Sequence, residues 1–239
     1  QSHRLPPDSL AAVFDGHRCF AEIACEGSRR RVIYQGRESL TFNDVPGNLG
    51  EPAAKYYPAP GDPFFSKSEG FRQTVLKRED GLFWVTLELE PHAPGPPAHI
   101  HTSFAEYFVV AEGTLSVMFQ GQKRVVRASE TLLVPPGIPH RTFNETGSPV
   151  IVRAPLEPEY AMPERFSVFL KQAYGFFDES PANHRPPKAL LQMSRFGPEY
   201  DVWLASAPIP AQQALYFLIR PAARLLGYRT HYEKYLPLR

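Results

Sequence analysis

Three histidines and one glutamate stand in two short segments at spacings that suit a single metal ion. His99 and His101 are two residues apart, Glu106 follows five positions later, and His140 lies in a second, proline-rich segment. Side chains two residues apart on a strand point to the same face, so both imidazoles of the first segment can reach one point. Imidazole nitrogens with one carboxylate oxygen suit iron, manganese, nickel, copper or zinc better than magnesium or calcium. We therefore expect these four residues to bind one divalent transition-metal ion.

The residues around these ligands alternate as strands do. Apolar and polar side chains follow each other with period two at 83–90 and 114–119, which is typical of strands with one buried face. Further short runs of this kind, separated by turn sequences, lie at 71–77, 107–111, 123–127, 131–134 and 150–154. Many short strands at close, even spacing predict an all-β core, either a barrel or a sandwich.

The segments on either side of this core differ from it. Residues 1–63 combine a short helical pattern at 9–14 and a strand-like stretch at 31–42 with a connection rich in proline and glycine, so we expect an irregular N-terminal extension. Beyond it we place the β-barrel at 64–156. Residues 157–239 form a helical C-terminal extension packed on the barrel, because apolar residues recur there at helical spacing. We expect Pro221 to kink or split the last helix and Gly227 to end it.

Net charge and the distribution of apolar residues indicate which kinds of binding partner to expect. Twenty-six basic and 25 acidic side chains leave a formal charge of +1, which favours neither a nucleic acid nor an anionic membrane as partner. Residues 202–219 carry no charge, but prolines interrupt them, and a membrane span needs about 20 successive apolar residues. We expect this segment to dock on the barrel or to pair subunits in a homodimer, with contact at a membrane interface as the lesser alternative.

The cellular location stays open. The first residues are polar and broken by proline, so no signal peptide is visible, and the cytoplasm is slightly favoured. Cys19 and Cys25 are the two cysteines of the chain. Two cysteines make no disulfide scaffold, and the sequence does not decide whether they pair.

The metal-ligand candidates stand among turn-forming residues at fixed offsets. The two segments read His99-x-His101-x4-Glu106-x6-Gly113 and Pro135-x-Gly137-x2-His140-x3-Asn144. This arrangement resembles the paired motifs of the cupin superfamily. Two glycines usual in that pattern are replaced here by Ala93 and Ser129, which are turn positions and leave the ligands unchanged. The resemblance covers about residues 65–155 and implies a double-stranded β-helix (jelly-roll) barrel with a metal site inside it.

Strand parity also predicts the walls of a pocket. Residues two or four positions from a ligand on the same strand should point inward with it, so we expect substrate contacts from Phe108, Val110 and Thr142. We also expect contacts from Leu87 and Phe119, which belong to the apolar faces of neighbouring strands, with simple core packing as the alternative for these two. An apolar, aromatic cavity around a metal favours an uncharged organic substrate over a phosphosugar.

The superfamily hosts many activities, so the resemblance leaves three hypotheses. The first, which we favour, is an oxygenase or dioxygenase acting on a phenolic or enolic small molecule, with Glu106 both as metal ligand and as catalytic base. The second is a non-oxidative isomerase, cyclase or decarboxylase that uses the metal as a Lewis acid. The third is a non-catalytic protein that binds a small molecule.

Overall fold

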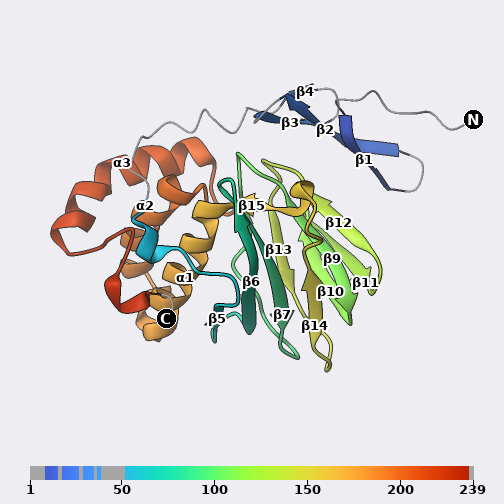
Figure 1. The fold of residues 1–239 in the computed structure, drawn as a ribbon. Helices are drawn as coiled ribbons and strands as arrows, with labels where there is room; N and C mark the ends of the chain where they lie inside the picture. The colour runs from blue at the N-terminus through green and yellow to red at the C-terminus, as the bar shows by residue number, and fades with distance from the viewer. Residues whose placement is uncertain (1–8, 16–17, 27–28, 35–36, 39–51, 237–239) are drawn as a thin grey trace, which may run out of the picture.

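The computed structural model describes residues 9–15, 18–26, 29–34, 37–38 and 52–236, with side chains from residue 52 onward. A β-rich barrel occupies the middle of the chain, and the C-terminal helices pack on one side of it (Figure 1). The all-β core with a helical C-terminal extension is therefore confirmed. The division of the chain at residues 63 and 156 stays a prediction.

Two antiparallel sheets build the barrel. The larger sheet has the order β12 (Thr131–Val134), β9 (Glu106–Glu112), β14 (Val150–Arg153), β7 (Leu82–Leu89), β6 (Phe71–Glu79) and β5 (Pro63–Ser66), with β15 (Met162–Pro163) paired to β7. The smaller sheet has the order β11 (Gln122–Arg127), β10 (Thr114–Phe119), β13 (His140–Phe143), β8 (His99–Ile100) and β16 (Trp203–Leu204). All seven strands predicted from alternation are present. No strand was predicted at β5, β15 or β16, because these segments show no clear alternation in the sequence. Strands β8 and β13 carry His99 and His140, whose placement on strands the ligand argument already assumed.

Helices follow the barrel in the chain. The α-helices are α1 (Glu164–Glu179), α2 (Lys188–Tyr200) and α3 (Ile209–Leu225), and short 3-10 turns are η1 (Ala54–Tyr56), η2 (Pro158–Tyr160), η3 (Pro181–His184) and η4 (Glu233–Tyr235). Helix α1 packs against β5 and β7, and α2 packs against α3. Helix α3 continues through Pro221, so this residue does not split the helix, and the kink expected there stays a prediction. Pro221 lies on an exposed part of α3, where water can bind the carbonyl that loses its N–H donor. The helix ends at Leu225, just before Gly227, which has a φ of +85°.

Two apolar cores hold these parts together. One lies between the sheet and the helices and includes Phe64, Phe83, Phe166 and Phe196, each at most 5% exposed. The other fills the barrel itself. Burial of such side chains is the main stabilising term, at about 2–3 kcal/mol for each large one.

The N-terminal residues form a sheet of their own. Its order is β1 (Ser9–Asp15), β2 (Arg18–Glu26), β3 (Arg29–Tyr34) and β4 (Arg37–Glu38). The short helix expected at 9–14 is therefore wrong, because pairing with β2 overrides the weak helical preference of its Leu-Ala-Ala run. The strand-like stretch expected at 31–42 falls partly on β3 and β4. Among the described residues, no helix combines the length and the apolar character needed to cross a membrane.

Candidate metal centre and its cavity

The structure brings the four predicted ligands together. His99 lies on β8, His101 just after it, Glu106 at the start of β9 and His140 at the start of β13. His99 and His140 pair directly across neighbouring strands, and their ring centroids are 4.4 Å apart. One ligand atom from each of the four residues lies within 4.8 Å of every other. We call this group the His/Glu cluster; its composition and spacing could hold a metal ion.

Each imidazole in the cluster is oriented by a backbone carbonyl. The Nδ1 atoms of His99, His101 and His140 lie 2.9, 2.8 and 2.9 Å from the carbonyl oxygens of Pro97, Asp201 and Ile138. These contacts assign a proton to Nδ1 of each ring and leave the Nε2 atoms of His99 and His101 as lone-pair nitrogens, while Nε2 of His140 is hydrogen-bonded to Glu106. Metal-binding histidines are held in the same way by carbonyls or carboxylates behind them.

One buried nitrogen of the cluster, Nε2 of His101, has no hydrogen-bond partner among the described residues. It lies 3.9 Å from a carboxylate oxygen of Glu106. His140 Nε2 lies 2.7 Å from the same oxygen. A buried, unpaired nitrogen is costly to keep, at about 1–3 kcal/mol, unless a ligand satisfies it. The residues present therefore fit a transition metal, both in donor type and in having a free lone pair.

Charge in the cluster also suits a cation. Burial, with His140 and His101 close by, lowers the pKa of His99 to about 3, and burial likewise lowers the pKa of His101. Burial alone would raise the pKa of Glu106, but the hydrogen bond from His140 and the nearby imidazoles outweigh it and lower this pKa to about 2. Burial opposes protonation of His140, yet its hydrogen bond with Glu106 gives a raised pKa overall. At neutral pH His99 and His101 are thus neutral and Glu106 is ionised, the forms that bind metals, whereas a metal ion would displace any proton that His140 shares with Glu106.

Asp201, which sequence analysis missed, fastens the cluster to the C-terminal extension. Its carboxylate accepts hydrogen bonds from the backbone N–H and the hydroxyl of both Thr102 and Ser103, each at 2.7 Å. The indole N–H of Trp203 donates to the same carboxylate at 2.8 Å. Asp201 thereby fixes the turn between two ligands and holds His101 through its own carbonyl. It lies 100 residues from His101 in the chain, and no motif marks it.

A cavity of about 910 Å³ opens beside the His/Glu cluster. Leu87, Phe108 and Thr142, three of the residues expected to contact a substrate, line it. Val110 is only 1% exposed and packs in the barrel core, and Phe119 packs against the same core. That the first three contact a substrate stays a prediction.

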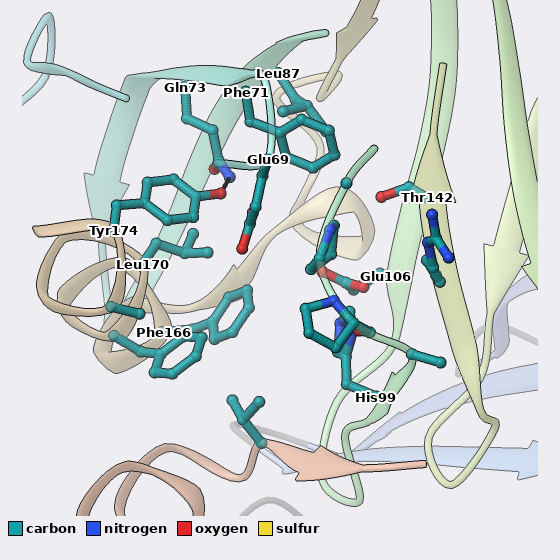
Figure 2. A pocket seen from close by; sticks show the side chains of 18 of the residues that line it. Glu69, Phe71, Gln73, Leu87, His99, Glu106, Thr142, Phe166, Leu170 and Tyr174 are labelled. Carbon is teal, nitrogen blue, oxygen red and sulfur yellow. Dashed lines mark hydrogen bonds between the residues drawn. The ribbon is translucent and has the colours of Figure 1, made fainter. Parts of the chain in front are cut away.

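The far side of the cavity comes from outside the barrel motifs. Figure 2 shows Phe166, Leu170 and Tyr174 of α1 facing the side that carries His99 and Glu106. The ring of Phe166 meets the edge of the His101 ring at a centroid distance of 4.9 Å. The helical spacing in the sequence shows that α1 has an apolar face, but not that this face closes the cavity.

The turn residues of the two motifs serve the backbone. Ser129, which replaces a usual glycine, still adopts the left-handed conformation with a φ of +71°. Gly95 approaches the Thr142 carbonyl so closely that a Cβ atom would lie 1.8 Å from its oxygen, so no side chain fits there. The side chain of Asn144 donates to the carbonyls of Glu90 and Ser148, as expected of a turn residue.

Comparisons with known proteins agree with this geometry. Residues 85–154 match the Cupin_2 family, described as a cupin domain. A "Probable oxidoreductase virH" of Hypocrea virens (strain Gv29-8 / FGSC 10586) is 26% identical over 197 residues, which cover 74% of this chain and 87% of the relative.

Similar solved structures include TT1209 of Thermus thermophilus, with 18% identity over 38% of this chain and 85% of that one at a TM-score of 0.34. They also include an RmlC-like cupin of Shewanella frigidimarina NCIMB 400, with 20% identity over 46% of this chain and 94% of that one at a TM-score of 0.31.

Proposed function

Since this chain belongs to the cupin superfamily through the barrel that contains residues 85–154, we propose that it is a metal-dependent oxidoreductase of a small organic molecule, of the oxygenase or dioxygenase type. The observation that carries this proposal is the buried, unpaired Nε2 of His101 inside a cluster whose other donors already face it. Similarity to a probable oxidoreductase supports the reaction class. We propose a phenolic or enolic substrate, because such a molecule suits an apolar cavity and offers an oxygen to a bound metal ion.

We propose that His99, His101, Glu106 and His140 hold one divalent ion of iron, manganese, nickel, copper or zinc. When bound, such an ion would supply Lewis acidity toward a substrate oxygen and, if redox-active, a path for electrons to dioxygen. Glu106 lines the cavity as an anion, but its lowered pKa makes it a weak base, so we propose that it would accept the hydroxyl proton of a substrate that a bound ion had made more acidic. Through its carbonyl, Asp201 keeps the His101 ring turned toward the cluster.

The cavity walls favour an uncharged substrate. Leu87, Phe108 and Phe166 present apolar surface next to the cluster, and burial there excludes water from the substrate. We propose that Leu87, Phe108 and Thr142 contact the substrate directly. A strongly charged ligand would lose its hydration without regaining it from these walls.

Metal content is the first test. Protein purified without added metal should contain close to one iron, manganese, nickel or copper ion per chain, and His101→Ala should contain less than about a tenth of that. His92→Asn is the matched control, because His92 is exposed and has a φ of 57°, which asparagine tolerates. Zinc alone would favour the Lewis-acid alternative, and a folded protein without metal would contradict the proposal in favour of simple ligand binding.

Oxygen consumption is the second test. Metal-loaded protein should consume dioxygen when phenols are supplied, and Glu106→Gln should lose this turnover while still folding. Retained turnover in that variant would contradict the role of Glu106 as base.

We also propose that α3 pairs two copies of the chain. Phe217, Leu218 and Leu225 are 79%, 73% and 89% exposed on this helix, and an apolar patch of this kind marks contact surfaces. Sedimentation should show a dimer that Leu218→Glu converts to a monomer. A monomeric wild-type protein would contradict this assignment.

A further inference from the structure

A second polar group faces the same cavity from the side opposite the His/Glu cluster. It consists of Glu69 in the loop between β5 and β6, Gln73 on β6 and Tyr174 on α1, and we call it the distal group. In Figure 2 the three side chains converge at one end of the cavity, whereas His99 and Glu106 lie at the other. No residue of the distal group belongs to the cupin motifs, and the chemistry proposed above does not use it.

Two of the three side chains are fixed by each other. Gln73 and Tyr174 are 6% and 5% exposed, and the Gln73 amide donates to the Tyr174 hydroxyl oxygen at 2.7 Å. The hydroxyl therefore acts as an acceptor on one side, and its own hydrogen remains for donation toward Glu69 or toward a ligand.

The loop that carries Glu69 is held before any ligand arrives. The Gly95 N–H donates to the Glu69 carbonyl at 3.1 Å, which ties the loop to the barrel. Asp178 of α1 accepts hydrogen bonds from the N–H groups of Lys67 and Ser68 at 2.6 and 2.9 Å. A group that is positioned in advance binds more tightly, because less ordering is required on binding.

The surroundings also keep the distal group uncharged. Burial, assisted by the negative charge of Asp178, raises the pKa of Glu69 to about 8, although its hydrogen bond with Tyr174 acts in the opposite direction. Burial, with Glu69 nearby, holds the pKa of Tyr174 well above its ordinary value. At pH 7 this end of the cavity therefore presents a carboxylic acid and a phenol, both able to donate and accept hydrogen bonds.

Other charged residues of the cavity stand on different walls. Glu106, Arg141 and Arg153 come from β9, β13 and β14, whereas Tyr174 and Asp178 of α1 are the ionisable groups that act on Glu69. A carboxylate or phosphate at the distal end would face the negative charge of Asp178, and none of the described residues that act on Glu69 is a cation. A neutral oxygen group would instead gain hydrogen bonds inside an apolar cavity.

Building on the proposed function, we propose that Glu69 and Tyr174 form a subsite for a neutral hydroxyl or carbonyl group at the far end of the substrate. The near end of the same molecule would approach the His/Glu cluster. Phe71, Leu87, Phe166 and Leu170 provide the apolar wall between the two ends. The substrate class is thus an uncharged, largely apolar molecule with an oxygen function at each end.

Binding to metal-free protein tests this subsite independently of turnover. We would compare 4,4′-dihydroxybiphenyl with 4-hydroxybiphenyl by isothermal titration calorimetry at pH 7. Wild-type protein should bind the first about tenfold more tightly, as expected for a well-placed hydrogen-bonding group. In Tyr174→Phe and Glu69→Leu this preference should fall to about twofold or less.

Two further variants make the result specific. Glu69→Gln should keep the preference, because glutamine resembles a neutral carboxylic acid, and exposed Glu90→Gln should behave as wild type. Equal affinities for the two probes in wild-type protein, or binding of neither probe, would overturn the subsite. Because no metal is present, a failure of oxygen consumption would leave this result unaffected and would count only against the proposed function.

The pH dependence identifies the donor. 4-Hydroxy-4′-methoxybiphenyl offers only an acceptor at one end, so its preference over 4-hydroxybiphenyl reports a donor in the subsite, which we assign to protonated Glu69 rather than to the Tyr174 hydroxyl. This preference should be present at pH 6.5 and decline about fivefold by pH 9 in the wild type, but stay constant in Glu69→Gln. A preference that does not change with pH in the wild type would overturn the assignment of Glu69 as the donor and would give that role to the Tyr174 hydroxyl.

Discussion

The cavity has a carboxyl group at each end, and at neutral pH Glu106 is an anion whereas Glu69 is a neutral acid. Both are withdrawn from water, which by itself raises the pKa of a carboxyl. Glu106 is hydrogen-bonded to His140 and lies near the imidazoles of His101 and His99, and its pKa falls to about 2. At Glu69 burial, assisted by the negative charge of Asp178, raises the pKa to about 8. The comparison shows that the imidazole neighbours outweigh burial at the metal end, whereas burial prevails at the other end and leaves a neutral acid.

The largest expected effect comes from making the same change at both carboxyls. Glu106→Gln removes a charged ligand, so we expect metal content and oxygen consumption to fall by at least about 100-fold. Glu69→Gln preserves a neutral hydrogen-bonding group, so metal content should stay within about twofold of wild type. Elemental analysis and an oxygen electrode measure both. Equal losses in the two variants would mean that the two ends of the cavity are not functionally distinct.

Asp201 offers a second way to sharpen the difference, because it supports only the metal end. Asp201→Asn keeps a side chain that tolerates the left-handed backbone at φ 54°, but it replaces an acceptor oxygen by an amide group. We expect metal affinity to weaken about 10–100-fold, as for other residues that orient a metal ligand. Competition with a chelator measures this, with exposed Asp80→Asn at φ 52° as the matched control. Unchanged affinity would show that the Thr102–Ser103 turn holds without the carboxylate.

The sequence predicts one end of the cavity far better than the other. His99, His101 and Glu106 lie within eight residues, so strand parity and spacing suffice to bring them together. Asp201 and Tyr174 reach their positions only because α1 and β16 pack on the barrel, and the sequence contains no local pattern for such packing. Glu69 stands in a loop, where an isolated glutamate normally indicates exposure.

Strand parity also could not distinguish residues that line the cavity from residues that pack in the barrel core. Val110 is four positions from Glu106 on β9, so parity predicts that both side chains point toward the cavity. Val110 is instead 1% exposed and pairs with Val152 in the barrel core, whereas Leu87 lines the cavity. We expect Val110→Ala to lower the free energy of unfolding by about 2–3 kcal/mol and leave 4-hydroxybiphenyl binding within about twofold. Leu87→Ala should weaken that binding about tenfold. Denaturant unfolding measures the change in stability, and calorimetry measures the change in binding. Weaker binding in Val110→Ala with unchanged binding in Leu87→Ala would place Val110 at the cavity and Leu87 in the core.

The smallest expected effect is a pH-dependent stability difference at the distal end. The pKa of Glu69 is about 8 in the folded protein and near the ordinary 4.5 when unfolded, so between these values the folded state binds the extra proton. The stability this proton provides is complete below pH 4.5 and is lost as the pH rises through 8.

Glutamine does not titrate, so Glu69→Gln should melt close to wild type at pH 5 and about 2–4 °C above it at pH 9. This shift corresponds to about 1 kcal/mol, which is less than the full pKa change implies because the side chain is partly exposed. Thermal unfolding at pH 5, 7 and 9 measures the difference, and a constant difference across this range would show that Glu69 is ionised in the folded protein, like Glu106.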